Sequence, residues 1–190
     1  MKIVNLISII LIVTLTIIAQ PKIVHKQMGY QADNNIMADR IQIWNAAIET
    51  ARIYPLFGIG MFNWKEIKLD DLQISIENRH EKFIKENYML QFGHAHSLYF
   101  STLTEKGFIG FSMLIIFMVI WLKELIKNYF LLKKNSLFLF WGGSLSAWIG
   151  IFGVGLVNST FNHENGILAC LLLGLFLNSI KTITKEKNYV

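Results

Sequence analysis

Residues 137–157 read LFLFWGGSLSAWIGIFGVGLV and contain no charged side chain. An α-helix rises about 1.5 Å per residue, so about 20 apolar residues cross the ~30 Å hydrocarbon core of a bilayer. This stretch is therefore predicted to span a membrane. Together with three further apolar runs, it predicts transmembrane helices over residues 3–20, 107–126, 136–158 and 165–180. The alternative for the first run is a cleaved signal peptide, although a small-x-small cleavage site is missing there.

The composition of the 190 residues agrees with a membrane protein. Hydrophobic residues make up 53% of the chain and charged residues only 16%, whereas a soluble domain carries about a quarter charged residues. This deficit argues against a nucleic-acid-binding protein and against a cytosolic enzyme. The single cysteine, Cys170, excludes an intramolecular disulfide and a cysteine-rich metal site, and its apolar surroundings in the sequence favour a packing role.

The distribution of charge predicts the orientation of the chain. Residues 123–135 carry four lysines against one glutamate, and the tail 181–190 carries three lysines against one glutamate. Residues 21–106 balance ten basic against ten acidic side chains. By the positive-inside rule, both termini and the 123–135 loop are expected in the cytoplasm. Residues 21–106 then form one large domain on the other side of the membrane.

The external stretch is expected to be helical, which makes the whole fold all-α. One helix is predicted over residues 39–53, with Pro55 after its end. Residues 56–62 (LFGIGMF) are predicted to form a glycine-broken loop. One or two weaker helices are expected within residues 65–90. Residues 94–105 lack the alternation of a strand and are predicted to form a helix that runs toward the membrane.

The first candidate site is the sequence Gly93-His94-Ala95-His96-Ser97, close before the second apolar run. Histidine changes its charge near neutral pH and serves as a general acid or base. A histidine at this position would lie at the level of lipid headgroups. Two alternatives stay open: His94 and His96 are half of a zinc site, or they are surface histidines at a loop tip.

The second candidate site is the helix that carries Arg40, Trp44 and Arg52. Arg40 and Trp44 are one helical turn apart and share a face. An arginine there is suited to bind a phosphate with two parallel hydrogen bonds, while Trp44 lines a sugar or the membrane interface. The alternative is that both arginines are solvated charges, that Glu49 pairs with Arg52, and that Trp44 is an interfacial anchor.

Three motif pieces then follow one another in a recognisable order. They are Arg40-xxx-Trp44, Pro55-xx-Gly58-x-Gly60, and His96-Ser97 followed after nine residues by Gly107-xx-Gly110. This order, inside an external loop between two spans, resembles the O-antigen ligase and O-antigen polymerase superfamily. The resemblance covers about residues 3–180 and corresponds to the carboxy-terminal portion of such proteins.

The resemblance implies an integral membrane glycosyltransferase of the bacterial inner membrane, with a helical architecture related to the GT-C enzymes. Such proteins transfer a glycan from undecaprenyl diphosphate to lipid A-core at the periplasmic face, without a metal or other cofactor, by inversion. Residues 21–106 would be the periplasmic loop domain, and nucleic acid is not expected as a partner. Two other members of the superfamily remain as alternatives, O-antigen polymerase and protein O-glycosyltransferase.

The resemblance also assigns roles to residues. His96 matches the histidine proposed to activate the acceptor hydroxyl, and Arg40 matches the arginine thought to bind the diphosphate. His94 and Arg52 are nominated for these two roles only by their position. Arg40 is expected to lie near His96, with both facing the membrane surface. Structural roles are implied for the remaining motif residues, Trp44, Pro55, Gly58, Gly60, Ser97 (commonly asparagine in the family), Gly107 and Gly110.

Members of this superfamily have further amino-terminal spans, which supply part of the lipid groove and at least one more arginine. The resemblance therefore implies a truncated or partial member that depends on such helices. Whether the chain is an enzyme by itself stays open. The alternative is an inactive fragment, or a membrane module that binds glycan or lipid.

Overall fold

The computed structural model describes residues 36–90, 93–161 and 163–188, and the described residues form helices, turns and loops with no strand among them. The expected all-α fold is confirmed for these residues. The chain divides into two units, residues 1–40 and 41–190. The predicted span over residues 3–20 lies outside the described residues, and only residues 36–40 of the first unit are described.

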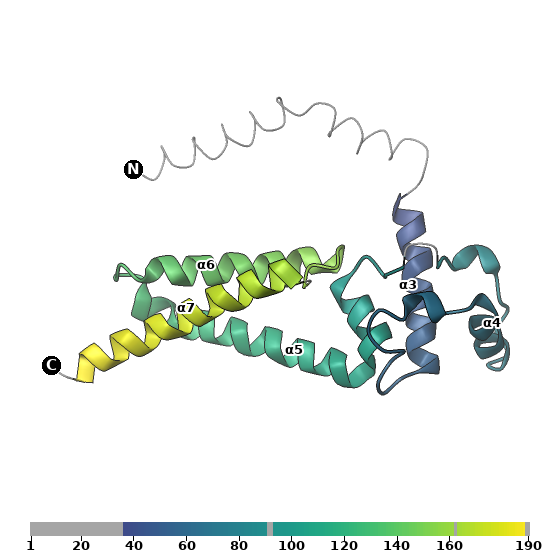
Figure 1. The fold of residues 1–190 in the computed structure, drawn as a ribbon, viewed down its shortest axis with the longest axis horizontal. Coiled ribbons are helices and arrows are strands. Elements are labelled where there is room, and N and C mark those ends of the chain that lie inside the picture. Colours follow the sequence, from purple (N-terminus) through teal and green to yellow (C-terminus); the bar gives the residue numbers. More distant parts are fainter. Residues whose placement is uncertain (1–35, 91–92, 162, 189–190) are drawn as a thin grey trace, which may run out of the picture. The chain divides into compact units, whose positions relative to one another are not determined.

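The first described element is α3 (Ile36–Ile53), which ends two residues before Pro55, as predicted (Figure 1). A proline disfavours helical geometry in the residue before it, so a helix ends there. The predicted loop over residues 56–62 is also confirmed. The following stretch contains one α-helix, α4 (Leu69–Glu77), and two short 3-10 turns, η1 (Trp64–Glu66) and η2 (Lys85–Asn87).

Three long elements follow, α5 (Leu98–Leu132), α6 (Phe138–Trp148) and α7 (His163–Asn188). A π-helical turn, η3 (Ile149–Gly153), and a 3-10 turn, η4 (Val154–Leu156), extend α6. These three helical segments lie side by side in Figure 1. By length and apolar composition each is able to cross a membrane, over Leu98–Leu132, Phe138–Leu156 and Glu164–Lys185. The protein is therefore a membrane protein.

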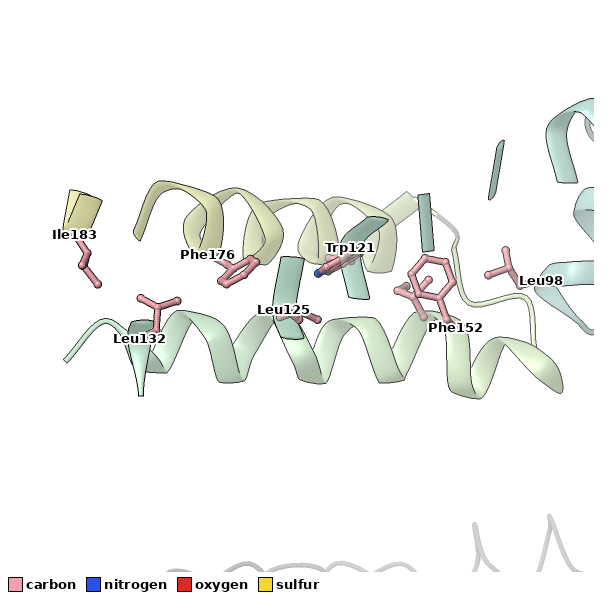
Figure 2. Packing of buried hydrophobic residues seen from close by; sticks show 9 residues of the cluster. Leu98, Trp121, Leu125, Leu132, Phe152, Phe176 and Ile183 are labelled. Atoms are coloured by element: carbon pink, nitrogen blue, oxygen red, sulfur yellow. The ribbon is translucent and has the colours of Figure 1, made fainter. Parts of the chain in front are cut away.

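The three helices pack on a shared apolar core, shown in Figure 2. Their outer faces expose apolar side chains. Trp121 and Leu125 of α5 are buried against Phe152 and Phe176. Several polar groups inside this region are bonded between helices, since a bilayer offers them no water. Three indole N–H groups donate across the contact of α5 and α6: Trp121 to Ser144 Oγ, Trp141 to Leu125 O and Trp148 to Met118 O, at 2.8, 2.8 and 3.0 Å.

Helix α5 is broken at Gly107, where the backbone has φ 63° and ψ −166°. Only glycine adopts this region without large strain. The break separates a short helical segment, residues 98–106, from the long apolar one, residues 108–132. It also leaves carbonyl groups at the end of the first segment and amide groups at the start of the second without partners in α5.

The loop after α3 supplies those missing partners. Four backbone hydrogen bonds join the two: Phe108 N–H to Pro55 O at 2.7 Å, Ile109 N–H to Leu56 O at 3.3 Å, Ile59 N–H to Thr104 O at 3.0 Å, and Gly60 N–H to Glu105 O at 2.9 Å. We call this connection of residues 55–60 with residues 104–109 the glycine junction. The two glycine motifs of the sequence are thus the two halves of one structure.

The glycine junction has no space for side chains at its centre. A Cβ atom on Gly58, whose φ is +65°, would overlap the carbonyl groups of Thr104 and Glu105. A Cβ atom on Gly107 would overlap the backbone of Leu56 and Phe57. These contacts explain why both motifs need glycine, and they fix the loop to the point at which the apolar part of α5 begins.

Candidate functional site

The segment with the two histidines, residues 93–97, is a turn and not the helix predicted from residue 94. Gly93 and His96 have positive φ angles of 67° and 48°, which are incompatible with a right-handed helix. Helix α5 therefore begins at Leu98, with Ser97 as its extended N-cap. A non-glycine residue in the left-handed region is uncommon, and such strain gathers at functional sites. The positive φ distinguishes the backbone of His96 from that of His94, and Phe62 and His80 share this feature.

The 93–97 segment is held from two sides. On one side, the Trp44 indole donates to Ala95 O at 2.9 Å, and its ring stacks on Phe100 with centroids 5.2 Å apart. On the other side, Ser97 Oγ donates to Gly155 O at 3.4 Å and Leu98 N–H donates to Asn158 O at 3.1 Å. Trp44 and Ser97 thus position the backbone around the histidines, which accounts for their place in the motif.

The two histidines contact each other, and His94 faces a cleft. Their ring centroids are 4.0 Å apart, with the planes at 48°. His94 lines a cleft of about 990 Å³, which we call the His94 cleft. His96 packs against His94 and is half-buried. The polar side chains that line this cleft belong to His94, Ser101, Glu105, Lys106 and Ser159.

Glu105 is a cleft residue that the sequence reasoning missed. Its half-buried carboxylate faces the backbone amide of Phe62 and interacts electrostatically with Lys106 and His94. The signal in the sequence was the charged pair Glu105-Lys106 directly before a long uncharged run. Cys170, expected to pack in an apolar segment, is instead exposed on α7 and lines the same cleft.

The structure places Arg52 in an ion-pair network on α3. Arg52 Nη1 lies 3.2 Å from Glu49 Oε2, which confirms the Glu49–Arg52 pair of the alternative but does not test its other parts. Arg79, from the end of α4, donates to both oxygens of Glu49 at 2.7 and 2.9 Å, and Ser75 Oγ donates at 2.6 Å. Arg52 is more than half exposed and is absent from the described lining of the His94 cleft.

The Glu49 network predicts a dependence of stability on pH. Burial raises the pKa of the Glu49 carboxyl, but the hydrogen bonds from Arg79 and Ser75 outweigh it, so the pKa lies below its ordinary value. This stabilisation is present above pH 4.5 and is lost as the pH falls through the lowered pKa. We expect the unfolding temperature of the protein to fall over this range, and that of Glu49→Gln to fall less.

The matched control for this measurement is Glu77→Gln, which changes an exposed carboxylate on α4. Its unfolding temperature should follow the pH dependence of the unchanged protein. An equal loss of stability on acidification in Glu49→Gln and in the unchanged protein would contradict the role of the network.

Arg40 lies in α3, in the first unit of the chain, so its predicted proximity to His96 stays a prediction. Its role in binding a diphosphate is likewise untested. The described residues include no group of three histidine, cysteine, aspartate or glutamate side chains that is arranged to hold a metal ion.

Comparison with known proteins gives one match. The family model described as O-antigen ligase matches residues 1–115 of the chain. This range contains Arg40, Trp44, the glycine junction and the histidine segment. No curated protein and no solved structure matches the chain.

Proposed function

The chain belongs to the O-antigen ligase family, and from this premise we propose that it transfers a glycan from undecaprenyl diphosphate to a hydroxyl group of lipid A-core. The observation that carries the proposal is the His94 cleft. Its lining includes His94 and Glu105, and His96 packs against His94, immediately before the apolar part of α5. A lipid-linked donor presents its diphosphate and first sugar at this level of the membrane.

The chemistry needs a base on one side of the sugar and positive charge on the other. The acceptor oxygen attacks the anomeric carbon, the bond from that carbon to the diphosphate oxygen breaks, and its electron pair leaves with the diphosphate. The acceptor proton passes to a histidine, for which we propose His96, with His94 in contact with the substrates. Arg40 would neutralise the growing charge on the leaving diphosphate, and Lys106 at the cleft adds a second cation.

One displacement at the anomeric carbon inverts its configuration and needs no covalent enzyme intermediate. The proposal also includes the location. The 21–106 domain would lie in the periplasm, the spans in the bacterial inner membrane, and both termini in the cytoplasm, as the lysine-rich segments 123–135 and 181–190 favour.

The test is a transfer assay in proteoliposomes with a radiolabelled undecaprenyl diphosphate-linked glycan. Three acceptors are offered separately: lipid A-core, a second lipid-linked repeat unit, and a protein with serine and threonine hydroxyls. Labelled lipid A-core is the expected product. Product with only the second or third acceptor would replace the ligase assignment by polymerase or protein glycosyltransferase. Donor binding without product on any acceptor would indicate a binding module.

Glu105 gives a sharper prediction within this function. Glu105 interacts electrostatically with His94, which contacts His96, so its carboxylate stabilises the imidazolium that forms when the acceptor loses its proton. We expect Glu105→Gln, which keeps the size of the side chain, to lower the transfer rate about tenfold without unfolding the protein. The initial rate of transfer and the unfolding temperature are measured on the same preparation.

Glu66→Gln, a change of an exposed carboxylate in η1, is the control and should keep the full rate. If Glu105→Gln transfers as fast as this control, the carboxylate has no part in the reaction.

A further inference from the structure

The loop between α3 and η1 exposes apolar side chains to an unusual extent. Residues 54–62 read YPLFGIGMF and contain no charged side chain. The exposed fractions of its large side chains are 48% for Tyr54, 59% for Leu56, 73% for Phe57, 60% for Met61 and 75% for Phe62. A contiguous apolar surface of this kind is rare on a water-exposed domain and indicates a binding surface.

The position of this loop is fixed by the glycine junction. Its carbonyl groups accept hydrogen bonds from the amides of Phe108 and Ile109, the first residues of the apolar part of α5. The loop is also braced internally, since the Asn63 side chain donates to Ile59 O at 2.9 Å. The exposed apolar side chains are therefore held in place at the end of a membrane-spanning helix.

The apolar surface of the loop continues into the outer face of α5. Phe108 and Ile109 are 54% and 40% exposed, directly beside the bonds to Pro55 and Leu56. The charged residue before them is Lys106, which is exposed at the junction. This change from an exposed lysine to exposed apolar residues is typical of the boundary between headgroups and acyl chains.

We propose that residues 54–62 insert into the lipid bilayer at its headgroup–acyl boundary and form a second membrane contact besides the spanning helices. The occupant of the apolar surface is lipid, because the loop is bonded to the helix that lipid already surrounds. Met61 and Phe62 also line the His94 cleft. The insertion therefore places one wall of that cleft at the bilayer surface.

The experiment uses a fluorescent depth probe on the complete chain in lipid vesicles. Cys170→Ser removes the single cysteine, Phe57→Cys introduces another, and the thiol is labelled with an environment-sensitive fluorophore. Nitroxide-bearing phosphatidylcholine, with the nitroxide near the headgroup end of the acyl chain, quenches fluorophores at that depth, and iodide quenches fluorophores in water. We expect blue-shifted emission, at least about twofold quenching by the nitroxide lipid, and weak quenching by iodide, as for side chains seated about 5–10 Å into the boundary.

Ile74→Cys in the same background is the matched control, because Ile74 is an apolar residue of α4 that is 58% exposed. Its probe should be quenched by iodide and not by the nitroxide lipid. Leu56→Cys, also in the loop, should repeat the result of Phe57→Cys. Agreement between the two shows that the result does not come from a folding defect at one position.

Two results would overturn the proposal. Strong quenching of the loop probes by iodide would place residues 54–62 in water. Blue-shifted emission without quenching by either agent would show that protein covers the loop instead of lipid.

Discussion

Gly107→Ala is expected to destabilise the protein by at least about 3 kcal/mol, enough to remove most of the folded protein from a membrane preparation. The added methyl group would meet the backbone of Leu56 and Phe57, which has no side chain that is able to move aside. It would also strain a residue whose φ is +63°. Gly58→Ala, on the opposite half of the glycine junction, should have a similar effect for the same reason.

Thermal unfolding in detergent, followed by tryptophan fluorescence, measures this loss. Gly93→Ala is the matched control, because Gly93 has nearly the same φ, +67°, but its added Cβ would meet nothing within 4 Å. That variant is destabilised only by the backbone strain, about 1–2 kcal/mol. If Gly107→Ala unfolds at the same temperature as Gly93→Ala, the glycine junction does not have the tight backbone contact described above.

His96→Ala is expected to reduce glycan transfer by a factor of about 10²–10⁴, the usual contribution of a general base. Alanine at a φ of +48° is strained, so His96→Asn is the companion variant, since asparagine tolerates the left-handed region. Both variants should lose transfer, while only the alanine variant loses stability. Initial rates with lipid A-core and a labelled donor check this prediction.

His80 provides the control for the histidine prediction. It is exposed in the loop after α4, and its φ of +62° matches that of His96 in sign. His80→Asn should retain the full rate. A loss in His94→Asn that exceeds the loss in His96→Asn would move the role of the base to His94, and full activity of both variants would exclude the mechanism.

The parts of the fold that follow from local signals were predictable from the sequence. Pro55 marks the end of α3, glycines mark the loop after it, and uncharged runs mark the long helices. The start of α5 at Leu98 was not predictable in this way, because it depends on bonds from Trp44 to Ala95 and from Leu98 to Asn158, more than 50 residues away.

The candidate site was predictable to a similar degree. The motif order pointed to His94 and His96, and the structure brings their rings together. Glu105 was not predicted as a site residue, because its neighbours His94 and Phe62 are distant in the sequence. The bidentate pair of Arg79 with Glu49 was also not predicted, because the two residues are 30 positions apart in the sequence. Arg40 stays a prediction, because its unit is described only from residue 36.

The π-helical turn η3 shows that the number of residues between α5 and the contacts of the histidine segment matters, as well as their identity. Such a turn holds one residue more than an α-helical turn, and it often marks a functional site. The extra residue is accommodated locally, so deletion of one residue between Ile149 and Gly153 would restore an α-helical turn and leave the direction of the following residues nearly unchanged. Deletion of one residue from α6, which is a regular helix, would instead rotate everything after it by about 100°. Gly155 and Asn158 would then turn away from Ser97 and Leu98, which bond to them now. A single-codon deletion in α6 should therefore disable the histidine segment from a distance, whereas one in η3 should be tolerated better.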